Sequence, residues 1–147
     1  MRKWARLAVA AVAATYATSM MRAEDGKKVT SRVGNCQATV PANWAVSTTA
    51  GIASSPDKKV SVAVGSPAKV ASFDALKQNA RKMYTHDKVV KDSAGDFQME
   101  GQSMSGKPNV YRAIPLAAGR FCMVEVIYQS GTADDARKIA ASLKPAK

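Results

Sequence analysis

Two glutamates are the residues of this chain best suited to acid and base chemistry. Glu100 and Glu125 each lie within a segment of otherwise apolar or neutral residues. If the two segments form neighbouring strands, the carboxylates can face each other, which is the arrangement that glycosidases use for an acid and a base. The alternative, which we favour, is a solvated sheet face on which each glutamate pairs with Arg112 or Arg120.

The two cysteines, Cys36 and Cys122, have a chemistry that depends on the compartment. In an exported chain they predict one disulfide that ties an early strand to a late one. Closing a loop of this length stabilises a fold by about 4 to 5 kcal/mol in the chain-entropy model. The alternatives are two buried free thiols, or strands too far apart for a bond. A redox-active role is disfavoured, because there is no Cys-x-x-Cys motif and neither cysteine begins a predicted helix.

Other catalytic and metal-binding patterns are weak. His86 is the only histidine, and it follows a predicted helix, where an interaction with the helix dipole explains it better than a hydrolytic triad with Asp87. The sequence contains no Gly-x-Ser-x-Gly elbow and no Asp-x-Asp-x-Asp-Gly loop. One histidine and two bridged cysteines leave only carboxylates as metal ligands. We therefore expect a protein that is not an enzyme and that carries no metal and no cofactor.

The N-terminal segment predicts export. Residues 1–23 have the layout of a secretory signal peptide, in which basic residues precede an apolar stretch and then small residues, with cleavage near 17–19 or after Ala23. The apolar stretch is too short to span a bilayer comfortably. We expect a flexible leader over 24–35, a single domain over 36–147, no transmembrane segment after cleavage, and a periplasmic or secreted location.

The charge favours anionic partners. The chain has a formal net charge of +11, and removing residues 1–23 takes away four basic residues and no acidic one, which leaves +7. Such a surface attracts lipid headgroups, acidic polysaccharides or acidic proteins. Nucleic acid is disfavoured because the basic residues are scattered and few aromatic residues lie between them. The candidate basic face for a partner comprises Lys77, Arg81, Lys82 and Lys88.

The sequence predicts the order of the strands and helices that position these residues. We expect three strands, a helix, four strands and a second helix, which is an α+β fold with an antiparallel sheet of about six or seven strands. The strands are predicted over 36–40, 44–54, 60–64, 88–92, 96–104, 109–116 and 121–128, and the helices over 73–84 and from Thr132 to Leu143. Ser72 and Thr132 are the expected helix caps.

The helical spacing assigns side chains to faces. In the first helix the predicted inner stripe comprises Phe73, Leu76, Ala80, Met83 and Tyr84, and the outer face comprises Lys77, Gln78, Arg81 and Lys82. Met99, Met104 and Met123 are expected to fill the core, although a methionine-lined groove for an apolar ligand or partner is the alternative.

The turns add a resemblance to a known fold. A Pro-x-x-Trp turn follows the first predicted strand, with Pro41 and Trp44, and a Ser-Pro-Asp hairpin over 55–57 precedes the valine-rich strand. With the order of elements, this resembles the photosystem extrinsic protein PsbP and the Ran-binding factor Mog, and small exported bacterial relatives such as the DcrB-like proteins, over about 36–143. The resemblance implies a non-enzymatic binding or assembly role and assigns no functional residues.

We therefore expect a monomeric exported binding or accessory protein. Its partner would be a protein or an anionic envelope component, and an immunity or adaptor protein is one specific version. The alternative is a carrier of a lipid or other apolar small molecule between the sheet and the helices. A small envelope hydrolase that uses Glu100 and Glu125 is less favoured.

Overall fold

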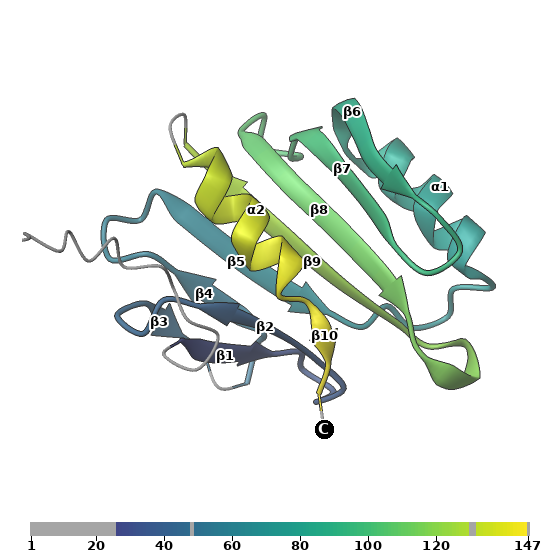
Figure 1. Ribbon diagram of the computed structural model, residues 1–147, viewed down its shortest axis with the longest axis horizontal. Coiled ribbons are helices and arrows are strands. Elements are labelled where there is room, and N and C mark those ends of the chain that lie inside the picture. The colour runs from purple at the N-terminus through teal and green to yellow at the C-terminus, as the bar shows by residue number, and fades with distance from the viewer. Residues whose placement is uncertain (1–25, 48, 130–131, 147) are drawn as a thin grey trace, which may run out of the picture.

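The computed structural model describes residues 26–47, 49–129 and 132–146, and the predicted signal peptide lies outside this range. A seven-stranded antiparallel sheet forms the centre of the fold (Figure 1). Its strands, in spatial order, are β3 (Ala45–Val46), β4 (Ile52–Ser54), β5 (Val60–Gly65), β9 (Phe121–Tyr128), β8 (Pro108–Pro115), β7 (Phe97–Gln102) and β6 (Thr85–Asp92). The predicted α+β class, with two helices and a seven-stranded antiparallel sheet, is confirmed.

A smaller second sheet lies beside the first. It comprises β1 (Lys27–Thr30), β2 (Cys36–Val40) and β10 (Lys144–Pro145), with β2 in the centre. Two of these strands differ from the prediction. The expected flexible leader over 24–35 contains β1, which pairs Val29 with Ala38, and the residues after the predicted last helix, to which no element was assigned, contain β10, which pairs Pro145 with Cys36. Both short strands form because every residue of β2 is buried and its two edges need hydrogen-bond partners.

The first helix, α1 (Phe73–Met83), covers one face of the large sheet. Its N-terminus is capped as predicted, because the Ser72 hydroxyl accepts a hydrogen bond from the Ala75 N–H at 3.1 Å. Leu76 and Ala80 pack in one apolar cluster with the sheet residues Phe97, Met99, Tyr111, Ala113 and Phe121. The helix lies over the β6 and β7 side of the sheet (Figure 1).

The second helix, α2 (Ala133–Ala141), covers the opposite face. Ala136, Ile139 and Ala140 pack in a second cluster with alternate residues of β9 and β5 and with the inward residues of β2. The predicted side-chain cap at Thr132 is wrong, because its hydroxyl donates to the Gln129 carbonyl oxygen at 2.8 Å. No helix in the described part of the chain is both long and apolar enough to cross a membrane.

Several side chains lie on other faces than the spacing predicted. Lys77 is buried although we expected it to face solvent, because it lies one turn after Phe73 and in line with Ala80 on the inner stripe. Met83 and Met104 are 53% and 79% exposed instead of filling the core. The predicted strand over 44–54 is a hairpin of β3 and β4, which turns at Gly51 with φ of 67°.

Candidate functional site

The predicted disulfide is present and connects the two sheets. Cys36 of β2 and Cys122 of β9 are bonded, their Cα atoms are 5.5 Å apart, and neither residue is exposed. Because β2 and β9 belong to different sheets, the bond holds the small sheet against the central strand of the large one. The ends of several chain segments meet around it.

Hydrogen bonds hold these segments together beside the disulfide. The Asn35 side-chain amide donates to the Ser66 hydroxyl at 2.8 Å, and that hydroxyl donates to the Phe121 carbonyl oxygen at 2.8 Å. The Ala146 N–H donates to the Asn35 carbonyl oxygen at 2.9 Å. We call the region formed by residues 31–36, 65–71, 113–122 and 143–146 the disulfide end.

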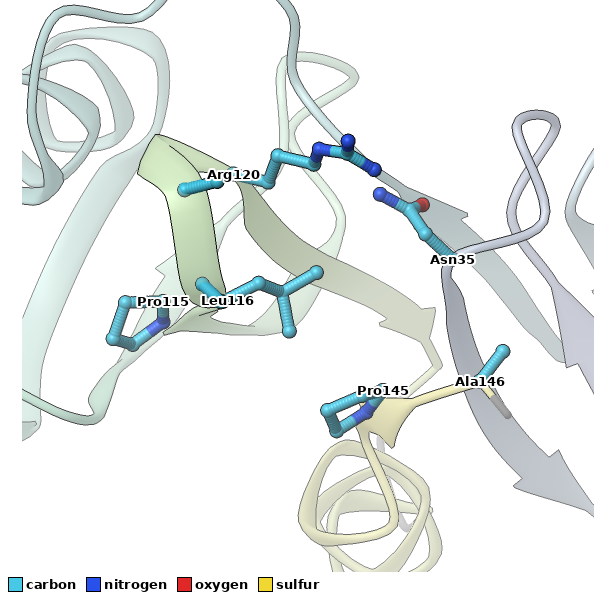
Figure 2. A pocket seen from close by; sticks show the side chains of 8 residues that line it. Asn35, Pro115, Leu116, Arg120, Pro145 and Ala146 are labelled. Carbon is cyan, nitrogen blue, oxygen red and sulfur yellow. The ribbon is translucent and has the colours of Figure 1, made fainter.

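The disulfide end contains an open hollow of about 610 Å³ (Figure 2). Its lining residues come from three parts of the chain and are Asn35, Pro115, Leu116, Ala117, Ala118, Arg120, Pro145 and Ala146. Figure 2 shows the Arg120 guanidinium and the Asn35 amide nitrogen turned toward each other on one side, and Leu116 and Pro145 on the other. The volume lies within the range of small-molecule sites, roughly 300 to 1,000 Å³.

The backbone between β8 and β9 shapes one wall of this hollow. The Leu116 N–H donates to the Arg120 carbonyl oxygen at 2.7 Å, which closes a tight connection around the short 3-10 turn at Ala117–Gly119. Ala118 and Gly119 both have positive φ, at 61° and 69°. A left-handed conformation is unfavourable for alanine, which has a Cβ atom. The turn is therefore held in a conformation that its sequence does not favour by itself.

The charges at the disulfide end are all positive. Its four segments contain Arg32, Lys69, Arg120 and Lys144 and no acidic residue. None of these four cations forms an ion pair with a described residue. We call them the end cations. A surface region whose charges have one sign attracts ligands of the opposite sign.

The predicted basic face, which lies on α1 and β6, is less available than the sequence suggested. Lys77 is buried, and its ammonium donates to Asp92 and to the Ser93 carbonyl oxygen, each at 2.7 Å. Arg81 donates to the other oxygen of Asp92 at 2.6 Å. Hydrogen bonds from Lys77 and the charges of both cations lower the pKa of Asp92. Of the four predicted residues, Lys82 and Lys88 are exposed and form no ion pair with a described side chain.

The two glutamates do not face each other. Strand β8 lies between their strands, and its residue Val110 is paired with both Glu100 of β7 and Val126 of β9. Because side chains alternate along a strand, Glu100 shares a face with Val126, and Glu125 points to the opposite face. This separates the two carboxylates and leaves the hydrolase hypothesis without its acid and base pair.

Each glutamate has partners other than those predicted. Glu100 accepts a hydrogen bond from Arg137 of α2 at 2.7 Å, and Glu125 accepts one from the Asn109 amide at 2.8 Å. Arg112 instead pairs with Asp96 and donates to carbonyl oxygens at the end of α2. Arg120 lines the hollow.

Glu125 belongs to a half-buried polar cluster at the edge of α1. Burial raises the pKa of Glu125, while hydrogen bonds from Asn109 and Tyr84 oppose that shift. Burial, together with the charge of Glu125, raises the pKa of Tyr84 to about 12. The centroids of the Tyr84 and Tyr111 rings lie 5.4 Å apart, and both rings pack beside the cluster. The net result is a pKa of Glu125 that is raised above that of an ordinary glutamate.

Two other predictions concern histidine and metal sites. His86 lies in β6, and its side chain lies outside what the structure describes. Among the described residues, no three side chains of His, Cys, Asp and Glu gather into a group that could hold a metal ion.

Sequence reasoning missed the residues of the hollow. Asn35 and Arg120 belong to no sequence motif. They lie close together because of the disulfide and because Arg120 directly precedes β9. A signal was nevertheless present, because Asn35 precedes Cys36 and Arg120 lies two residues before Cys122. The neighbours of two bonded cysteines must lie close together, so both residues were available as candidates.

Comparison with known proteins adds no assignment. No protein-family model matches the chain, and no protein with a curated description matches it. The resemblance to PsbP and Mog stays a prediction.

Proposed function

We propose that this chain is an exported, non-enzymatic binding protein that holds an anionic component of the cell envelope at its disulfide end. The observation that carries the proposal is the set of end cations. Arg120 lines the hollow, and Arg32, Lys69 and Lys144 lie in the chain segments that meet beside it, none of which contains an acidic residue. On the α1 face, in contrast, two of the four predicted cations are bound to Asp92.

Export is supported by two independent features. Residues 1–23 have the pattern of a secretory signal, which supports a location in the periplasm or outside the cell. The buried disulfide between Cys36 and Cys122 is typical of an oxidising compartment.

The hollow favours a lipid-like envelope component over an acidic protein. A stable protein interface buries roughly 800 Å² on each partner and is spread over 20 to 30 residues. The hollow is small, its walls are mostly apolar, and among the described residues Arg120 is the one charged residue in its lining. Such a site suits a headgroup with an attached apolar chain, which also supports the alternative function of a lipid carrier.

Sedimentation with vesicles tests the proposal. We expect the mature protein to bind vesicles of phosphatidylglycerol and phosphatidylcholine, to bind pure phosphatidylcholine much more weakly, and to be released as salt increases. The triple variant Arg32→Gln, Lys69→Gln and Lys144→Gln should bind on the order of 100-fold more weakly, since each basic residue near an anionic surface contributes about 1 kcal/mol.

The control is the double variant Lys82→Gln and Lys88→Gln, which removes two exposed cations outside the segments of the disulfide end. Because it removes two charges and the triple variant removes three, the quantity to compare is the loss of binding for each charge removed. That loss should be much smaller in the control, and an equal loss per charge would contradict the proposed site. Salt-sensitive binding to soluble polyglutamate without binding to anionic vesicles would instead identify an acidic protein as the partner and overturn the envelope proposal.

A further inference from the structure

The two polar groups in the hollow at the disulfide end are both hydrogen-bond donors. The Arg120 side chain is exposed and has no hydrogen-bond or ion-pair partner among the described residues, and the Asn35 amide nitrogen has a second N–H beyond the one that bonds to Ser66. These two groups are turned toward each other (Figure 2). Donors that converge without an acceptor between them are complementary to an anion, because an anion accepts from both.

The remaining walls of the hollow are apolar. Pro115, Leu116 and Pro145 contribute the larger surfaces, and three alanines contribute small side chains that leave the space open. A simple inorganic anion would use Arg120 and Asn35 and leave these walls in water. A ligand that also has a hydrocarbon part would cover them.

We infer that the hollow binds one small amphiphile with a single terminal anionic group. The carboxylate or phosphate lies between the Arg120 guanidinium and the Asn35 amide, and the hydrocarbon chain lies against Leu116 and the two prolines. This inference rests on the proposed function, and it adds a discrete 1:1 site to a surface that attracts anions. A guanidinium binds carboxylate and phosphate in the same bidentate way, so both headgroups belong to the inferred ligand class.

Calorimetric titration of the mature protein with short amphiphiles tests the inference. Octanoate and octyl phosphate, below their micelle concentrations, should each bind with a stoichiometry of one, and octanol should bind at least tenfold more weakly. Affinity should rise from butanoate to octanoate by up to about fourfold for each methylene group, because that is the effect of removing one such group from water. A preference for one headgroup would distinguish a fatty acid from a phosphorylated lipid as the natural source.

Two kinds of variant localise the binding. Arg120→Gln should weaken octanoate binding at least tenfold, and Lys82→Gln, which removes an exposed cation on α1, should leave it unchanged. Ala146→Trp and Ala117→Trp each place a large ring in the hollow and should abolish binding, while Ala94→Trp in the exposed turn before β7 should not. Thermal unfolding identifies any variant that fails to fold, and the second tryptophan variant then decides.

The outcomes separate the inference from the proposed function. If Arg120→Gln and both filling variants bind octanoate like the wild type, or if octanol binds as well as octanoate, the amphiphile site is wrong. Vesicle binding that depends on Arg32, Lys69 and Lys144 would then still support the proposed function. Octanoate binding that requires Arg120, in a protein that ignores anionic vesicles, would support the site and contradict the envelope-binding role.

Discussion

Cys36 and Cys122 bond two sheets that share no backbone ladder. Cys36 lies in the central strand of the small sheet, and Cys122 lies in the central strand of the large sheet. Asn35, which precedes Cys36, and Arg120, which lies two residues before Cys122, both line the hollow. The disulfide therefore contributes to the stability of the whole domain and also fixes the distance between two walls of the proposed binding site.

Removal of the disulfide should destabilise the protein strongly. The bond closes a loop with a sequence separation of 86 residues, so the double variant Cys36→Ala and Cys122→Ala should lose about 4 to 5 kcal/mol of unfolding free energy in the chain-entropy model. Alanine is the suitable replacement because both sites are fully buried and apolar. Urea denaturation measures the loss. A reductant should lower the midpoint of the wild type and leave the double variant unaffected; an unchanged wild-type midpoint would contradict the structural role of the bond.

Lys77 should contribute to stability although it is a lysine on a helix. Its ammonium lies 4.8 Å from the centre of the Phe73 ring and donates to Asp92 and the Ser93 carbonyl oxygen. Lys77→Ala should lower the unfolding free energy by about 1 to 3 kcal/mol, because the variant loses charge-assisted hydrogen bonds and the packing of the lysine stem. Lys82→Ala, at an exposed position of the same helix, should change it by less than about 0.5 kcal/mol. Equal effects in urea denaturation would show that the interactions of the Lys77 ammonium do not stabilise α1.

The Lys77 variant should also change the acid response. The pKa of Asp92 is lowered in the folded protein, so its stabilising contribution is present above the ordinary carboxyl pKa of 3.8 and is lost as pH falls through the lowered value. In Lys77→Ala, Asp92 should contribute less to the decrease in unfolding free energy that occurs as the pH falls. Unfolding free energies measured between pH 5 and about 2.5 test this, and identical slopes for variant and wild type would contradict it.

The longest and most periodic segments were predictable, and the shortest strands were not. Strand β9 has eight residues and helix α1 has eleven, and the spacing of apolar residues in each segment fits only one type of secondary structure. Strand β1 has one buried apolar residue, Val29, between lysines and a threonine, and β10 has two residues, so neither has a period to detect. They form because of the unpaired edges of β2, which is a property of the assembled fold.

The same limit explains what was missed at the candidate site. Whether Glu100 and Glu125 meet depends on the number of strands between them and on the pairing register, and a shift of one residue moves a side chain to the other face. The cysteine pair was predictable from composition and compartment, whereas the convergence of Arg120 with Asn35 required the bond and the turn after β8. The pairing of Lys77 with Asp92 likewise depends on how β6 runs back along α1.

Gly51 should tolerate no side chain. It has φ of 67°, and a Cβ atom there would lie 2.6 Å from the Val64 carbonyl oxygen, which belongs to the backbone of β5. Gly51→Ala should therefore lower the unfolding free energy by about 1 to 3 kcal/mol through strain and displacement of the β3–β4 hairpin. Gly95→Ala is the control, because a Cβ atom at that turn meets nothing within 4 Å. Similar urea midpoints for the two variants would show that the hairpin turn is not constrained in this way.

Glu125 should make the protein less stable as the pH rises through its titration. Burial raises its pKa in the folded state, so the neutral acid is favoured in the fold, and the associated stability is fully present below the ordinary carboxyl pKa and is lost as pH rises through the folded value. Glu125→Gln keeps a carbonyl oxygen for the Asn109 amide and carries no charge. The unfolding free energy of this variant should not decrease through ionisation at position 125, and at pH 7 it should be at least as large as that of the wild type. Urea denaturation between pH 4 and 7 measures both.

The same variant should change the alkaline titration of a tyrosine. The pKa of Tyr84 is raised from 10.0 to about 12, first by burial and then by the charge and hydrogen bond of Glu125. In Glu125→Gln the charge is gone but the burial remains, so the pKa of Tyr84 should fall and stay above 10. Ultraviolet absorbance of tyrosinate measures this shift. Glu100→Gln removes a carboxylate from the opposite face, where it pairs with Arg137, and should leave the tyrosine titration unchanged. Equal shifts in both variants would mean that Tyr84 responds to overall charge, which would contradict a specific effect of Glu125 on its pKa.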